Sequence, residues 1–275
     1  DLHLVHSKPN LQATTYSRMG LIYAEKKDYP QAKTHYQEAL TRFRMSADDP
    51  NTLDVLISLS QAHYFSRDII AFRATNADVI AMYQKLDDKP SQAKHLILMG
   101  RTYFRDDEQN KSEAIAYFEA GVALYRELDD KPNEIESLKL LTDMFRDITP
   151  SINAMPHHER LLELIRQTDT NPKDEARCLY HIGELHLNLD QYEQSQSPLE
   201  EAFAVIKQTD DTPLLRLIMG ALSATYFYQK QYDRAIIHLD ALLPHYTQAN
   251  DTRAIGQTSR MLVMRHFYLQ DYCVA

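Results

Sequence analysis

The chain has 275 residues, of which 44% are hydrophobic and 25% are charged, a composition typical of a folded globular protein and too apolar for disorder. The 30 Lys and Arg against 39 Asp and Glu give a formal net charge of −9, which argues against a general nucleic-acid binder because phosphate contacts require a basic surface. No run of 18 apolar residues is present, so we expect no membrane-spanning segment, and the absence of a glycine-rich phosphate loop argues against a nucleotide-dependent enzyme.

A pair made of an apolar residue and its neighbour, usually a small one, recurs along the chain at steps of 40 to 42 residues. A ring-bearing residue follows each pair three positions later. Spacings of three and four residues place these positions on one face of an α-helix, and the small residue lets two helix backbones approach closely. The seven pairs are Met19-Gly20, Leu59-Ser60, Met99-Gly100, Leu141-Thr142, Ile182-Gly183, Leu222-Ser223 and Leu262-Val263, and the rings are Tyr23, His63, Tyr103, Phe145, His186, Tyr226 and His266.

Each of these helices is followed by a second predicted helix with its own set of small and large residues. The clearest sets are Ala32-Tyr36-Ala39, Ala114-Phe118-Gly121, Ser195-Leu199-Ala202 and Ala235-Leu239-Leu242. Segments rich in Asp and Pro, such as 86–90, 128–132, 167–172 and 208–213, separate one pair of helices from the next, since these residues end one helix and begin another.

This pattern resembles the tetratricopeptide repeat (TPR) family, in its longer-repeat form known from bacterial signalling regulators and kinesin light chains. The resemblance implies an all-α, right-handed superhelical solenoid of antiparallel helix pairs, with one array over 1–275. We place six repeats and the start of a seventh at 13–52, 53–92, 93–134, 135–175, 176–215, 216–255 and 256–275.

Three positions depart from the pattern. The second helix of repeat 2 carries Phe72, Asn76 and Val79 at the expected positions, so we expect that helix to be irregular or shifted in register. In repeat 4 we expect a longer loop and a second helix that starts near Pro156. Pro198 falls inside the second helix of repeat 5, where it could kink the helix.

The spacing of residues in the sequence does not indicate a catalytic site or a metal site. His157 and His158 are adjacent, so they point in different directions on a helix, and His181 and His186 are not at the spacing of an HExxH zinc motif. We interpret the histidines as packing residues and Cys178 as a structural thiol. We therefore predict no enzyme activity, no cofactor and no metal.

The resemblance implies that the first helix of each pair lines a concave groove, so the exposed residues of those helices are the candidate binding residues. The alternative is that these charges are scattered on the surface and paired with Asp and Glu of neighbouring helices. Basic and aromatic side chains recur at these positions, and we predict a ligand-binding groove formed by Lys94, Arg101, Arg105, Lys139, Arg146, Arg177, Tyr180, His181, Tyr228 and Arg260.

The predicted function is binding of a protein or peptide, with an acidic or carboxylate-bearing ligand expected in the basic groove. We expect no direct contact with nucleic acid or membrane. By resemblance we favour the sensory or regulatory part of a larger bacterial signalling protein with an output domain beyond residue 275; a purely structural scaffold is the alternative. Two widely spaced cysteines favour a reducing, cytoplasmic compartment, while a periplasmic sensor segment stays open.

Overall fold

The structure is a computed structural model that describes residues 2–106, 111–148, 152–168 and 171–248. Within these ranges the chain forms twelve α-helices and one short 3-10 helix, with no β-strand. The chain divides into two compact units, residues 1–130 and 131–275, and each unit is described separately below. The all-α fold of antiparallel helix pairs predicted from the sequence is confirmed.

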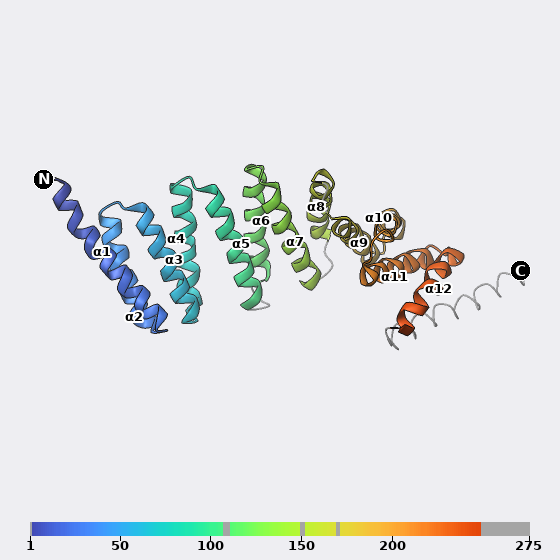
Figure 1. Cartoon of the computed structure of the whole chain (residues 1–275), viewed down its shortest axis with the longest axis horizontal. Coiled ribbons are helices and arrows are strands. Elements are labelled where there is room, and N and C mark those ends of the chain that lie inside the picture. The colour runs from blue at the N-terminus through green and yellow to red at the C-terminus, as the bar shows by residue number, and fades with distance from the viewer. Residues whose placement is uncertain (1, 107–110, 149–151, 169–170, 249–275) are drawn as a thin grey trace, which may run out of the picture. The chain divides into compact units, whose positions relative to one another are not determined.

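Six helices build the first unit and lie one beside the next (Figure 1). Each first helix, here called helix A, packs antiparallel against the helix B that follows it. The pairs are α1 (Leu2–Glu25) with α2 (Tyr29–Met45), α3 (Asp49–Phe65) with α4 (Ile69–Lys85), and α5 (Lys89–Asp106) with α6 (Lys111–Glu127).

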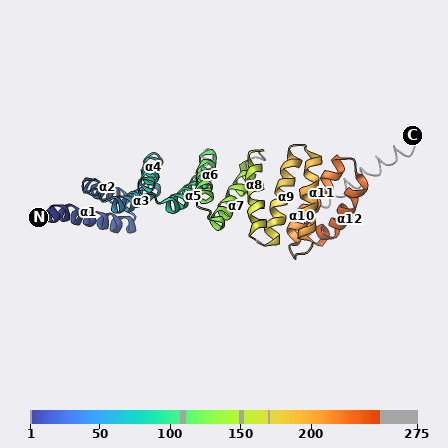
Figure 2. The same ribbon diagram turned by 90° about the horizontal axis from the view of Figure 1, so that it is seen from above.

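The second unit repeats this arrangement with six more helices (Figure 2). Its pairs are α7 (Lys131–Ile148) with α8 (Met155–Gln167), α9 (Pro172–Asn188) with α10 (Tyr192–Ile206), and α11 (Thr212–Tyr228) with α12 (Tyr232–Gln248). The 3-10 helix η2 (Ile152–Ala154) precedes α8. Within the described ranges, no helix is both long enough and apolar enough to cross a bilayer.

The small residue of the sequence pattern is the point where helix A meets helix B. A Cβ atom on Gly100 would lie 2.6 Å from Cε2 of Phe118 in α6, which no real side chain tolerates without a shift. Gly20 has the same relationship to Tyr36, and Gly183 to Leu199. Glycine lowers helix stability by roughly 1 kcal/mol relative to alanine, so the close packing of the partner ring or leucine must offset that loss.

One type of turn connects most of the helices. The second residue of the turn adopts a left-handed conformation although it is not glycine, and the residue after it is the N-cap of the following helix. Asp28, Asp48 and Asp68 each accept a hydrogen bond from the backbone N–H three residues later. The left-handed residues are Lys27, Ala47, Arg67, Asp87, Asp129, Asp190 and Lys230.

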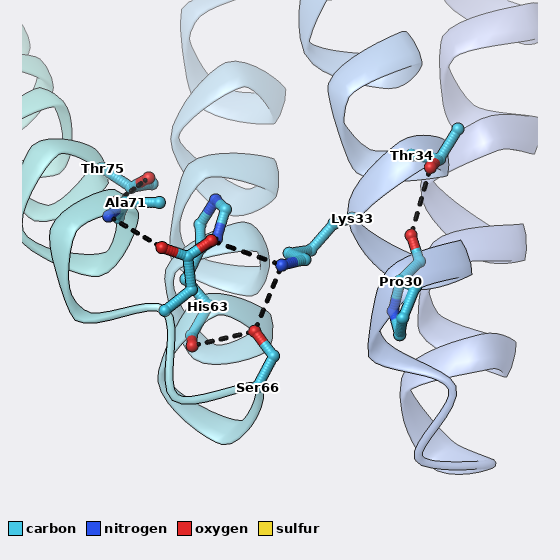
Figure 3. A network of polar contacts seen from close by, with 8 residues as sticks. Pro30, Lys33, Thr34, His63, Ser66, Ala71 and Thr75 are labelled. Atoms are coloured by element: carbon cyan, nitrogen blue, oxygen red, sulfur yellow. Dashed lines mark hydrogen bonds and ion pairs between the residues drawn. The ribbon is translucent and has the colours of Figure 1, made fainter.

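A cap of this kind also ties one repeat to the next (Figure 3). Lys33 of α2 donates to the Ser66 hydroxyl at 3.2 Å and lies 3.4 Å from the Asp68 carboxylate, which caps α4. The buried His63 ring faces the same carboxylate at 3.4 Å. The bond from the Ala71 N–H, followed by Lys33, lowers the pKa of Asp68, so the cap stays ionised at neutral pH.

The expectation for repeat 2 is wrong. Helix α4 is regular over 17 residues, and Phe72, Asn76 and Val79 are all buried in register. Asn76 is tolerated because its amide oxygen and its amide nitrogen both have partners: the oxygen accepts from Ser60 at 2.9 Å and lies 3.1 Å from His95 Nε2, and the nitrogen donates to the Phe72 carbonyl.

Prolines fall at the start of one helix B and inside another. In repeat 4, helix α8 begins at Met155 with Pro156 in its first turn, as predicted. Pro198 lies inside α10, which continues to Ile206.

Helix A starts four residues earlier than the predicted repeat boundaries in repeats 2 to 6. It begins at Asp49, Lys89 and Lys131 instead of at 53, 93 and 135, and likewise at Pro172 and Thr212. The reason is that proline in the first helical turn starts the helix within the turn segment itself. The partial repeat 256–275 lies outside the described residues, and one continuous array over 1–275 stays a prediction.

Candidate functional site

Helix α5 carries the clearest candidate surface in the first unit. Between residues 92 and 105 the only exposed side chains are Lys94, Leu98, Arg101 and Arg105, at spacings of four, three and four residues. These spacings place all four on one side of the helix. The opposite side is buried, with Ala93, Leu96, Met99 and Tyr103 in the core. We refer to the four exposed residues as the α5 stripe.

The α5 stripe is predominantly basic, and two of its cations have no counter-ion within the part of the chain that the structure describes. Among the residues that the structure describes, the side chains of Lys94 and Arg101 form neither an ion pair nor a hydrogen bond. In the described part of this unit, six other cations pair with acidic side chains. The pairs are Lys33–Asp68, Arg42–Glu38, Arg44–Asp78, Arg73–Glu113, Lys85–Asp49 and Lys89–Glu127.

Aromatic side chains of α3 lie next to the end of the α5 stripe. Arg105 donates from Nη2 to the Tyr64 hydroxyl at 2.9 Å, which links the C-terminal turns of α5 and α3. Phe65 contacts Tyr64 edge to face, with ring centroids 5.4 Å apart, and 60% of Phe65 is exposed. Helices α3 and α5 thus present basic, aromatic and aliphatic side chains together.

In the second unit the predicted basic residues lie in a mixed environment. Lys139 contacts the carboxylates of Asp174 at 2.9 Å and Glu136 at 3.4 Å, and these bonds raise its pKa despite its partial burial. Arg177 is exposed and makes no ion pair with any described residue. Lys139, Arg177 and His181 line one small hollow of about 80 Å³, together with Asp143 and Asp174.

Tyr180 and His181 point toward a shared carboxylate. Tyr180 is buried at 7% exposure and its hydroxyl donates to Glu184 at 2.7 Å, while His181 Nδ1 lies 3.3 Å from the same carboxylate. A second hollow of about 160 Å³ adjoins them. It is lined by Thr142, Phe145, Ala154, His158, His181, Glu184, Leu185 and Asn188.

Tyr228 stands at the end of α11, with 55% of it exposed. Its ring stacks on Tyr192 of α10, with centroids 4.6 Å apart and ring planes 15° from parallel. Phe65 stacks in the same way on Tyr29 in the first unit, at 5.7 Å and 17°. Both pairs join the end of a helix A to the start of the preceding helix B.

Two predicted site residues cannot be placed. The Arg146 side chain and the whole of Arg260 lie outside the described residues. The predicted residues also fall in different units: Lys94, Arg101 and Arg105 in the first, and the other described ones in the second.

His63, His95, His158 and Cys178 are buried in the helix stack. Within the described ranges, no group of three or more His, Cys, Asp or Glu side chains is placed to bind a metal ion. Burial raises the pKa of the Cys178 thiol to about 12, and its Sγ contacts the His158 carbonyl oxygen at 3.1 Å. A protonated, enclosed thiol of this kind is not a nucleophile at neutral pH.

The sequence reasoning missed the apolar part of this surface. It selected groove residues by charge and aromaticity, and it passed over Leu98, which is 52% exposed. The signal was available in the sequence. Leu98 falls at a predicted groove position, where it is flanked by charges, and an exposed leucine gains little from folding.

Comparison with known proteins identifies the repeat. The family model of the tetratricopeptide repeat matches residues 11–69 and 174–248. No curated protein sequence matches the chain.

Solved structures with the same fold share little sequence with the chain. The apo form of RapI has 15% identity and a TM-score of 0.56, covering 95% of this chain and 73% of RapI. Aspartyl phosphate phosphatase F from Bacillus subtilis has 13% identity and a TM-score of 0.51, covering 90% of this chain and 78% of that one.

A signal transduction ATPase with numerous domains from Pyrococcus horikoshii, which has a tetratricopeptide repeat sensor, has 16% identity and a TM-score of 0.52. The match covers 85% of this chain but 42% of the ATPase. At these identities the likeness concerns the fold. Residues 11–69 and 174–248 of the chain match the tetratricopeptide repeat, a type of repeat that forms protein-interaction modules.

Proposed function

We propose that the chain is the binding part of a bacterial regulatory protein and that it captures an acidic partner on its helix A faces. The observation that carries this proposal is the α5 stripe, where Lys94 and Arg101 are exposed and have no counter-ion among the described residues. Exposed cations held on a rigid helix are suited to carboxylate or phosphate groups of a ligand, and Arg offers two donors in a fixed geometry.

The regulatory role is supported by the kind of protein that shares the fold. One such protein uses its repeats as the sensor of a signal transduction ATPase, and another is named as an aspartyl phosphate phosphatase. A regulator must change when it binds, whereas a scaffold only holds its partners together. A change in the distance between two fluorophores, one on α2 and one on α6, would favour the regulator, and an unchanged distance would favour the scaffold.

The experiment for binding is selection of peptides from a random library on the wild-type protein. We expect enrichment of Asp and Glu, and loss of binding to a Lys94→Ala/Arg101→Ala variant. The matched control is Lys85→Ala/Lys89→Ala, which removes the same charge from residues already paired with Asp49 and Glu127. Selected peptides without acidic residues, or peptides that bind both variants equally, would contradict the proposal.

A further inference from the structure

The α5 stripe also contains information about the shape of its partner. Lys94 and Arg101 are seven residues apart, which corresponds to roughly 10 Å along a helix at about 1.5 Å per residue. Leu98 lies between them on the same side of α5 and is 52% exposed. The stripe therefore alternates a cation, an aliphatic anchor and a second cation along a straight line.

A second helix lying along α5 would meet this line at the same intervals. Residues i, i+3 or i+4, and i+7 share one face of a helix, so they recur at the spacing of Lys94, Leu98 and Arg101. Recognition of an amphipathic helix through apolar anchors at these positions is an established mode of peptide binding. The exposed ring of Phe65, which contacts Tyr64, the hydrogen-bond partner of Arg105, extends the apolar contact beyond the end of the stripe.

Charge complementarity decides which helix fits. The stripe offers Lys94 and Arg101 without a counter-ion among the described residues, and Arg105 beyond them. Neutral residues of a partner at these intervals would leave the cations unpaired, and basic residues would repel them. Acidic residues would form ion pairs with them.

We propose that the α5 stripe binds an amphipathic helix of a partner protein with acidic residues at i and i+7 and an apolar residue between them at i+3 or i+4. This inference rests on the proposed function, because it specifies the partner of the same surface. The apolar residue packs on Leu98, and the two carboxylates pair with Lys94 and Arg101.

This chain itself contains the complementary pattern. In α7, Glu136, Leu140 and Asp143 have the spacing of Lys94, Leu98 and Arg101 with the charges reversed, and Glu136 and Asp143 are exposed. A second copy of the chain is therefore the main competing occupant. The test separates the two by measuring the mass of the protein in solution.

The test uses four synthetic 18-residue peptides in an alanine-rich helical background. The first carries Glu at positions 5 and 12 and Leu at position 9; the second replaces Glu by Gln; the third replaces Glu by Lys. The fourth is the first peptide with the alanine at position 10 replaced by proline, which prevents a continuous helix. Affinities are measured by fluorescence anisotropy at low and high salt, with the wild-type chain.

The variants are chosen so that folding is controlled. Lys94→Glu/Arg101→Glu reverses the stripe, and Lys85→Glu/Lys89→Glu makes the same change in charge off the stripe, at the last residue of α4 and the first residue of α5. Leu98→Ala removes the apolar anchor without adding charge. Circular dichroism and thermal melting of each variant establish that its helices are intact before binding is compared.

We expect the Glu peptide to bind the wild type best and to lose roughly tenfold in affinity on the reversed variant, since exposed ion pairs are individually weak and reversal adds repulsion. The Lys peptide should bind the reversed variant better than the wild type. Leu98→Ala should weaken binding of the Glu peptide to the wild-type stripe and binding of the Lys peptide to the reversed stripe. Equal binding of the proline peptide would overturn the helical partner but leave an acidic ligand in place. Equal binding of the Gln peptide at low salt would overturn the charge pairing and the proposed function together.

The competing occupant has its own readout. If the wild-type chain is a dimer by analytical ultracentrifugation and the reversed variant is a monomer, a second copy occupies the stripe and the inference is overturned. A wild-type chain that stays monomeric while it binds the Glu peptide supports it.

Discussion

Arg160 of α8 holds the carboxylate of Glu134 in α7 through two parallel hydrogen bonds, from Nε to Oε1 at 2.9 Å and from Nη2 to Oε2 at 3.0 Å. The Glu134 side chain is only 1% exposed, so this charge is acceptable inside the second unit because a planar guanidinium neutralises it. The same bonds raise the pKa of Arg160. The pair fixes how helix B of this repeat sits on helix A.

Replacing Arg160 by Ala should therefore be strongly destabilising. We expect a loss of about 3 kcal/mol in the free energy of unfolding, because the buried carboxylate of Glu134 loses its bidentate partner. Lys139→Ala is the matched comparison: it breaks a pair whose members are about a third exposed, and we expect less than about 1 kcal/mol. Urea denaturation followed by circular dichroism measures both. A similar loss for the two variants would contradict this account.

Gly100 should not accept a larger side chain. A Cβ there would lie 2.6 Å from Phe118 Cε2 and 3.1 Å from the Ala114 carbonyl oxygen, so we expect Gly100→Leu to destabilise by about 1–3 kcal/mol or more through overpacking. Ala120→Leu, on the exposed side of α6, serves as the control and should change stability by less than about 0.5 kcal/mol. An unchanged melting temperature for the Gly100 variant would show that the repeat pattern is out of register.

His95 should make the first unit sensitive to acid. Burial lowers its pKa to about 4, against 6.5 for an ordinary histidine, so the folded protein holds the neutral ring while the unfolded chain takes up a proton. The contribution of the neutral His95 ring to the free energy of unfolding is thus fully present above pH 6.5. It is lost as the pH drops toward 4, which lowers the free energy of unfolding by roughly 3 kcal/mol.

His95→Gln provides the comparison, because it keeps a donor near Asn76 and cannot titrate in this range. We expect the free energy of unfolding of this variant to depend less steeply on pH between 6.5 and 4 than that of the wild type. Parallel curves for the two proteins would rule out His95 as the source of the acid sensitivity.

Cys178 should be unreactive in the folded protein. Its thiol is 3% exposed and has a pKa of about 12, so thiolate is scarce at pH 8. In a Cys273→Ser background, iodoacetamide should modify Cys178 only after denaturation in urea, as read by mass spectrometry. Rapid modification without urea would contradict the buried, structural role.

The helix pairs could be predicted from the sequence because the pattern repeats at near-constant spacing. Each small residue is required at its position because helix B packs closely against helix A there. Gly100, Gly183 and Gly20 all face the helix B residue that their position requires. The regularity of α4 could not be read in this way, because Asn76 looks unsuitable for a core until Ser60 and His95, from two other helices, are seen to satisfy its amide.

The candidate site was predictable only in part, for a similar reason. Exposure on the helix A face follows from the periodicity, and Lys94, Arg101 and Arg105 are indeed exposed. Which cations lack a counter-ion depends on contacts between helices. Lys139 and Lys94 are both predicted groove cations, yet Lys139 pairs with Asp174, 35 residues away, and Lys94 pairs with no described residue.

The most direct measurement of the central claim is the footprint of the Glu peptide on the isotopically labelled wild-type chain by NMR. Binding to the α5 stripe predicts that chemical-shift changes concentrate at Lys94, Leu98 and Arg101 in α5 and at Phe65 in α3, and that they disappear in the Lys94→Glu/Arg101→Glu variant. Changes centred on helix B residues of the first unit, or on the second unit alone, would contradict it.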